Sequence, residues 1–158
     1  MLVADFGAGA GFYSIPAAQL VGSSGRVYAL DIRKEMLEIV RSKARQARLL
    51  NIEIVRANLE ELHGSKLKDQ TIDRVIVSNI LFQVDNKNEM IAECYRVLKP
   101  RGTLLVVEWE KGASISLPPA QHMISKERAT ELFTSSGFTM EKEFFAGDKH
   151  YGLIFRKP

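Results

Sequence analysis

Short apolar runs alternate with amphipathic stretches along most of this chain. The apolar runs, which are rich in β-branched residues, are Met1–Ala4, Val27–Leu30, Ile52–Val55, Val75–Val77 and Leu104–Val107. Runs of this length with few polar residues are typical of strands buried on both faces of a sheet. The pattern therefore predicts five buried strands.

Between these runs, apolar residues recur at the three- and four-residue intervals of a helix that packs on a sheet. This spacing predicts helices over Lys34–Leu50 and Asn88–Leu98, the second ended by the turn Lys99–Gly102. A third helix is predicted from the N-cap Ser125 to Ser136, with Gly137 closing it. Alternating strands and helices indicate right-handed crossovers and a parallel sheet.

The end of the chain departs from this alternation. Two strand-like runs, Phe138–Phe145 and His150–Arg156, are separated by only Ala146–Lys149. Because this connection is too short for a crossover, the two strands must pair antiparallel. The longest irregular stretch is the loop from Glu110 to Ile124.

Composition narrows the class of protein. The 158 residues, 46% of them hydrophobic, suit a single domain over residues 1–158. Cys94 is the only cysteine, so disulfides and a thiolate metal site are not expected, and a reducing compartment fits best. Without an apolar run long enough to span a membrane, we expect a cytoplasmic protein. The net charge of +3 permits an anionic partner, but the basic residues are spread along the chain.

The turn after the first predicted strand indicates a nucleoside site. It has the sequence Asp5-Phe6-Gly7-Ala8-Gly9-Ala10-Gly11, and glycines at alternating positions let a ligand lie against the backbone. A dinucleotide fingerprint, G-x-G-x-x-G, would need a third glycine at position 12, which is Phe12. The acidic-x-G-x-G-x-G pattern instead resembles class I methyltransferases that use S-adenosylmethionine.

Later segments resemble the type-11, ubiquinone-biosynthesis-like branch of that class: Asp73, Arg96–Gly102 and the pair Glu108-Trp109. The resemblance implies a Rossmann-like, doubly wound α/β fold with a mostly parallel seven-stranded sheet of order 3-2-1-4-5-7-6, whose last strand is antiparallel. Family members usually carry helices before the first strand, and here Met1 already belongs to that strand. We therefore expect a fold without those helices. Either the active site is open, or another chain covers it, or this is a shortened form of a longer protein.

The resemblance also implies which residues bind S-adenosylmethionine. The glycine-rich turn contributes Asp5, Phe6, Gly7, Ala8, Gly9 and Gly11. Asp31 closes the second strand about twenty residues later, where its carboxylate can accept both ribose hydroxyls; a helix N-cap is the alternative. Ile32 and Met36 pack either against adenine or in the core.

Adenine and the methionine part of the ligand are assigned to the ends of the next two strands. The family usually carries an aspartate where this chain has Asn58, followed by Leu59. An asparagine amide can still accept from the adenine amino group and donate to a ring nitrogen, and an ordinary turn residue is the alternative. Ser78 and Asn79 face the methionine part. The following residues do not form the N-P-P-[YF] tetrad of enzymes that methylate nucleic-acid bases.

No catalytic dyad or triad is evident, and no catalytic residue is assigned. Methyl transfer from a sulfonium mainly requires alignment and desolvation, with a base only for some acceptors. His63, His122 and His150 are more typical of surface residues than of bases, and His150 is expected near the far edge of the sheet. Phe82, Trp109 and Met123 line either an acceptor pocket or the core.

The leading hypothesis is an S-adenosylmethionine-dependent methyltransferase with a small-molecule acceptor. A non-catalytic module that binds this cofactor and serves as a partner subunit is the alternative from another class. An RNA methyltransferase is a further alternative, suggested by the basic helix Arg33–Arg48, although such a charge run is usually a solvated face. Phe12 disfavours a nicotinamide dehydrogenase, and a single cysteine disfavours arsenite methylation.

Overall fold

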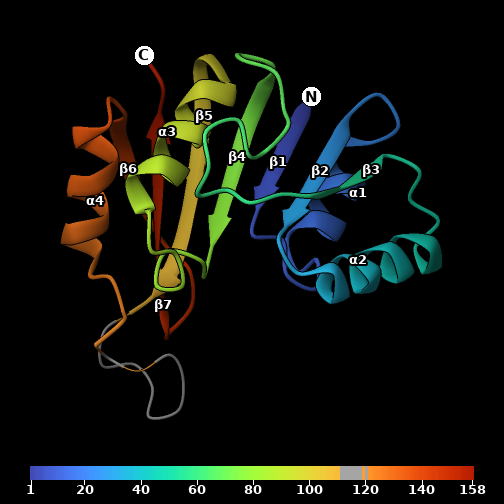
Figure 1. The fold of residues 1–158 in the computed structure, drawn as a ribbon, viewed down its shortest axis with the longest axis horizontal. Helices are drawn as coiled ribbons and strands as arrows, with labels where there is room; N and C mark the ends of the chain where they lie inside the picture. The colour runs from blue at the N-terminus through green and yellow to red at the C-terminus, as the bar shows by residue number, and fades with distance from the viewer. Residues whose placement is uncertain (111–118, 120) are drawn as a thin grey trace.

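A seven-stranded sheet forms the centre of the protein (Figure 1). The structure is a computed structural model and describes residues 1–110, 119 and 121–158. The strands are β1 (Leu2–Phe6), β2 (Arg26–Asp31), β3 (Ile52–Arg56), β4 (Ile72–Ser78), β5 (Leu98–Trp109), β6 (Thr139–Phe145) and β7 (His150–Arg156). Their order is β3-β2-β1-β4-β5-β7-β6, and only the pairs that include β7 are antiparallel. The predicted fold class and strand order are confirmed.

Helices cover both faces of the sheet. They are α1 (Ser14–Val21), α2 (Lys34–Gln46), α3 (Lys87–Val97) and α4 (Lys126–Ser135). Because side chains alternate along a strand, Val3 and Val27 face α1, whereas their neighbours in sequence face α3 and α4. Figure 1 places α2 and α4 at opposite ends of the sheet. The larger core lies on the α3 and α4 side and includes Phe6, Phe133 and Phe155, all fully buried.

Two local features differ from the sequence prediction, and a third agrees with it. Helix α1 was not expected, because its eight residues include Pro16 and show little amphipathic pattern. Helix α2 ends at Gln46 and not at Leu50, since Arg48 adopts a positive φ of 53°. The predicted turn Lys99–Gly102 is present, because it interrupts the β4–β5 pairing within β5: the register passes from Leu98 to Thr103, and Arg101 takes a φ of 64°. The N–H of Arg101 donates to Lys157 O, just beyond the end of β7, and this bond holds the turn against the sheet.

The start of α4 agrees with the prediction. Ser125 is its N-cap, and the Ser125 hydroxyl accepts the backbone N–H of Arg128. Gly137 follows the helix with a φ of 95°, a conformation that favours glycine. Most of the predicted loop Glu110–Ile124, namely residues 111–118 and 120, lies outside the described residues. Within the described part of the chain, no helix is both long and apolar enough to cross a bilayer.

Candidate functional site

A cavity of about 630 Å³ opens at the carboxyl ends of the parallel strands. This is the edge where open α/β sheets bind ligands, and the volume suits a small molecule. Ten of the predicted site residues line it: Asp5, Gly7, Ala8, Gly9, Asp31, Ile32, Asn58, Leu59, Ser78 and Asn79. The fold thus brings together residues from the ends of β1, β2, β3 and β4.

The glycine-rich turn is bent back against β2. The N–H groups of Gly7 and Ala8 both donate to Leu30 O, at 2.9 and 2.8 Å. Gly7 and Gly9 have backbone φ values of 78° and 51°, in a region that residues other than glycine rarely adopt. A Cβ at Gly9 would meet no atom within 4 Å, so its Cα borders open space in the cavity. The turn therefore offers bare backbone to a ligand.

Asp31 joins this turn to the end of β2. Its Oδ2 accepts the N–H of Gly9 at 2.9 Å, and its Oδ1 accepts the N–H of Arg33 at 2.9 Å. The N-cap of α2 is Arg33 and not Asp31. The carboxylate is nearly buried yet lines the cavity. Oδ2 keeps a lone pair for another donor, whereas Oδ1 also accepts a long bond from Arg33 Nε at 3.4 Å, which a hydroxyl at Oδ1 would replace. It is placed to accept a pair of adjacent hydroxyls.

Asn58 begins the segment that connects β3 to β4. Its Oδ1 accepts the N–H of Glu60 at 3.2 Å, and its Nδ2 donates to the Glu61 carboxylate at 2.7 Å. These bonds are those of a turn residue, but one lone pair and one N–H of the amide stay available. Gly64 packs directly on this residue, because a Cβ on Gly64 would lie only 1.8 Å from Asn58 O.

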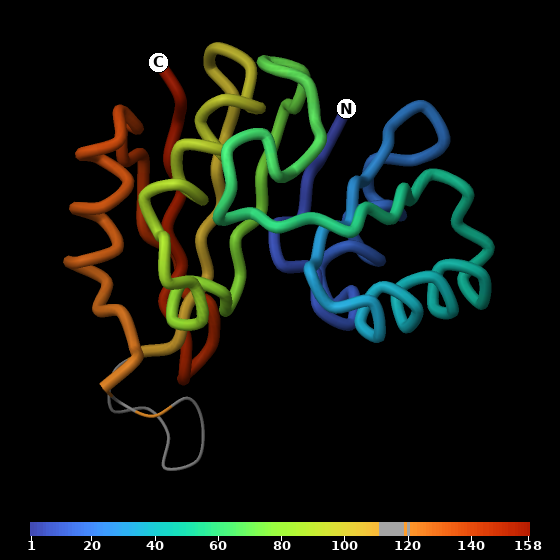
Figure 2. Tube along the Cα trace, viewed as in Figure 1, coloured from blue at the N-terminus to red at the C-terminus, as the bar shows by residue number. Residues whose placement is uncertain are grey.

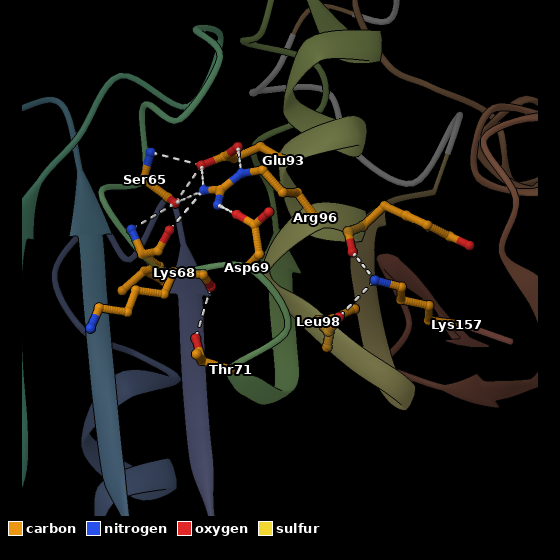
Figure 3. A network of polar contacts seen from close by, with 10 residues as sticks. Ser65, Lys68, Asp69, Thr71, Glu93, Arg96, Leu98 and Lys157 are labelled. Atoms are coloured by element: carbon orange, nitrogen blue, oxygen red, sulfur yellow. Dashed lines mark hydrogen bonds and ion pairs between the residues drawn. The ribbon is translucent and has the colours of Figure 1, made fainter.

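The same segment is anchored to α3 by a buried polar network. Figure 2 shows residues between β3 and β4 passing across the sheet towards α3. Ser65 donates both its N–H and its hydroxyl to Glu93, and Arg96 bonds Glu93, Asp69 and Leu67 O (Figure 3). Burial alone would raise the pKa of Glu93, but hydrogen bonds from Arg96 and Ser65 lower it. An ionised pair thus holds the segment that carries Asn58.

At the end of β4, the backbone turns sharply at Asn79. This residue takes a positive φ of 52°, and its N–H donates to Val107 O at 2.9 Å. Its Oδ1 is buried and has no hydrogen-bond partner among the described residues. The next residue, Ile80, packs on the glycine-rich turn, since a Cβ on Gly7 would lie 2.4 Å from Ile80 Cδ1. An oxygen that lacks a donor fits the ammonium of an amino acid.

Trp109 and His150 form an aromatic wall at the other side of the cavity. They are partners in the β5–β7 ladder, and their ring centroids are 4.2 Å apart. As expected, β7 lies towards the far edge of the sheet, between β5 and the edge strand β6, and this position also sets His150 beside Trp109. Burial, with a smaller contribution from Lys149, lowers the pKa of His150, so the imidazole is neutral at pH 7.

Other predicted residues lie elsewhere. Phe6 is buried in the core, and neither Gly11 nor Met36 lines the cavity. Of the three acceptor-pocket candidates only Trp109 lines it, and His63 and His122 are exposed. Lining residues that the sequence did not suggest include Phe12, Arg33, Glu60, Gln83, Val84 and Ala146. The sequence could have indicated three of these lining residues, because each lies within two positions of a predicted site residue: Phe12, Arg33 and Glu60.

Two buried carboxyl groups stand at the carboxyl ends of β1 and β5. Burial raises the pKa of Asp5 to about 6, and a hydrogen bond from the Ser14 hydroxyl at 2.6 Å partly offsets this effect. Burial likewise raises the pKa of Glu108 to about 7, against hydrogen bonds from Leu81 and Ile80 and the charge of Lys87. Both groups therefore bind protons more tightly in the native state than in the unfolded chain.

This difference predicts how stability depends on pH. A raised carboxyl pKa stabilises the native state at low pH, and that contribution is lost as pH rises through the native value. We expect Glu108→Gln to match the wild type near pH 5 and to be more stable near pH 8, by about 1–3 kcal/mol. Urea unfolding at both pH values measures this. The lowered pKa of His150 makes stability rise with pH in both proteins, so the informative quantity is the difference in unfolding free energy between Glu108→Gln and the wild type at each pH. Equal pH profiles would contradict the prediction.

Fold and cavity together define a Rossmann-like class I methyltransferase domain. The model of the family described as "Methyltransferase domain" (Methyltransf_11) matches residues 4–106. The chain belongs to this family of S-adenosylmethionine-dependent methyltransferases.

Relatives agree with this assignment. The ubiquinone/menaquinone biosynthesis C-methyltransferase UbiE of Haemophilus ducreyi is 40% identical over 110 residues, covering 69% of this chain and 41% of the relative. The enzyme of the same name from a Marinomonas species is 39% identical over 113 residues, covering 71% and 44%. The chain thus spans less than half the length of these relatives. The crystal structure of a SAM-dependent methyltransferase from Aquifex aeolicus superposes with a TM-score of 0.91 and 25% identity, covering 100% of this chain and 82% of that one.

Proposed function

We propose that residues 1–158 act as one domain that binds S-adenosylmethionine and transfers its methyl group to a small-molecule acceptor. The observation that carries the proposal is the contact between the glycine-rich turn and Asp31, whose Oδ2 accepts the N–H of Gly9 at 2.9 Å. It sets bare backbone and a carboxylate side by side in one cavity, which suits a ribose. The single, buried Cys94 supports a cytoplasmic location as part of the proposal.

The residues present fit the cofactor in three places. Gly9 leaves open space where a side chain would obstruct a sugar, Asp31 offers acceptors to the ribose hydroxyls, and Asn79 Oδ1 lacks a donor that an ammonium would supply. Ile32 and Leu59 line the same cavity and suit the faces of adenine, with the Asn58 amide at its edge. Bound S-adenosylmethionine supplies a methyl group that its sulfonium charge makes electrophilic.

The acceptor is assigned to the side of the cavity formed by Trp109 and His150. Val84, Val107 and Ala146 line the cavity as well, so the lining around the two rings is mostly apolar, with Gln83 as a polar neighbour. By contrast, the charged residues Asp5, Asp31, Arg33 and Glu60 belong to the side of β1, β2 and β3. Such a wall favours an acceptor with an apolar, uncharged body. The names of the similar bacterial enzymes support transfer to carbon, which we include in the proposal.

Binding of S-adenosylhomocysteine tests the proposal directly. Trp109, the only tryptophan of the chain, lines the cavity, so its fluorescence should change as the ligand binds. Calorimetry gives the affinity independently. No detectable binding at millimolar ligand would refute the proposal. Incubating a cell extract with the protein and isotope-labelled S-adenosylmethionine, followed by mass spectrometry, would then identify the acceptor; binding without any labelled product would favour the non-catalytic alternative.

A further inference from the structure

A buried carboxylate holds the turn that follows β4. Oε1 of Glu108 accepts the N–H of Ile80 at 2.8 Å and that of Leu81 at 2.7 Å. Glu108 is only 2% exposed, and it belongs to β5, 27 residues along the chain from Leu81. Two successive N–H groups that point at one oxygen form a small anion-binding concavity in the backbone. The side chain of Glu108 fills that concavity.

The turn held in this way contains a residue in the left-handed conformation. Asn79, directly before the two donors, has a φ of 52°, which is uncommon for a residue with a side chain. Without the carboxylate, two N–H groups would lose their partner next to this residue, and the buried Leu81 would leave its N–H unsatisfied. We therefore expect the turn to relax when the carboxylate is removed.

The turn also carries the residues assigned to the amino-acid part of the ligand. Asn79 and Ile80 line the cavity, and the Asn79 Oδ1 has no partner within the part of the chain that the structure describes. In the strand order, β4 lies on one side of β1, whereas β2 and β3, which carry Asp31 and Asn58, lie on the other. The adenosine and amino-acid parts of a ligand would therefore depend on different turns.

We infer that Glu108 is a positioning residue that keeps the Asn79–Ile80 turn in the shape that binds the amino-acid part of the methyl donor, an inference that rests on the proposed function. Glu108 does not line the cavity itself and acts only through the two backbone N–H groups. Its neighbours Val107 and Trp109 do line it, so the same segment of β5 borders the acceptor side. One carboxylate thus connects the acceptor side of the cavity to the turn beneath the methyl donor.

Two ligands separate this role from a general effect on folding. S-adenosylhomocysteine has the amino-acid part, and 5′-methylthioadenosine lacks it but keeps the adenosine and the sulfur. We expect Glu108→Ala to weaken S-adenosylhomocysteine binding roughly ten- to a hundredfold, while 5′-methylthioadenosine binding changes by less than about threefold. Both affinities are measured by calorimetry on the full chain, with Trp109 fluorescence as a second signal.

Two variants control for side effects. Glu108→Gln keeps an oxygen that can accept both N–H groups, so it should retain the affinity of the wild type for both ligands. Glu110→Ala removes an exposed acid two residues away and should change neither affinity. If Glu108→Ala does not fold, Glu108→Asp replaces it, because the shorter side chain keeps a carboxyl group but cannot reach both donors. The same selective loss is expected.

The outcomes are distinct. Equal losses for both ligands, or no loss for either, would overturn the role of Glu108 and leave the proposed function standing. Failure of the wild type to bind either ligand would instead refute the proposed function. A selective loss of S-adenosylhomocysteine binding that Glu108→Gln does not share supports the inference.

Discussion

Replacing Asp31 with alanine is expected to weaken S-adenosylhomocysteine binding roughly a hundredfold. In the proposed complex the carboxylate accepts both ribose hydroxyls, and hydrogen bonds to a charged group are among the stronger ones in proteins. The substitution also removes the acceptor of the Gly9 N–H, which is bonded at 2.9 Å, so the glycine-rich turn loses a contact that shapes it. Calorimetry on the folded variant measures the change.

A comparison of ligands separates the contact with ribose from the effect on the turn. In the wild type, 2′-deoxyadenosine should bind more weakly than adenosine, because one hydroxyl no longer donates to Asp31. In Asp31→Ala the two ligands should bind alike. Glu35→Ala is the matched control, since Glu35 is an exposed acid in the first turn of α2 and does not line the cavity. If adenosine keeps its advantage in Asp31→Ala, the assigned ribose contact is wrong.

Gly64→Ala is expected to destabilise the protein by about 2–3 kcal/mol. The added Cβ would lie 1.8 Å from Asn58 O and 2.9 Å from Glu61 O, and both are backbone atoms that cannot rotate away. The segment cannot shift freely either, because the next residue, Ser65, is bonded to the buried Glu93. The strain therefore falls on Asn58, and we expect S-adenosylhomocysteine affinity to fall as well. Urea unfolding and calorimetry test the two effects.

A substitution one residue earlier provides the control for Gly64. His63 is exposed and does not line the cavity, so His63→Ala should leave both stability and ligand affinity close to those of the wild type. A Gly64→Ala protein as stable as His63→Ala would show that the segment can move away from the clash. The anchoring role assigned to Ser65, Glu93 and Arg96 would then be wrong too.

The sequence was sufficient for most of the fold, because strand and helix signals are local. Five apolar runs and three amphipathic stretches were placed correctly to within a few residues, and a four-residue connection required an antiparallel end to the sheet. Where local signals were weak, the prediction failed. Helix α1 has little amphipathic pattern, and α2 ends at Gln46, before its predicted end, because Arg48 leaves the helical conformation.

The convergence of the candidate cofactor residues was likewise predictable from the chain alone. Parallel strands all end at one edge of the sheet, so the residues that follow β1, β2, β3 and β4 must converge there. That is why Gly7, Gly9, Asp31, Asn58 and Asn79 line one cavity. In a fold of alternating strands and helices, the positions of the strand ends along the sequence are therefore enough to predict which residues share this edge of the sheet.

Only the tertiary structure decided which distant residues complete and support that site. His150 reaches Trp109 because β7 enters the sheet beside β5, and Glu108 accepts the N–H groups of Ile80 and Leu81 in the turn after the neighbouring strand β4. Gly64 is restricted by the backbone of Asn58 and not by any local turn requirement. Such contacts join residues far apart in the chain, or depend on atomic packing within ångströms. Hydrophobic periodicity records neither, because it reports only which face of each element is buried.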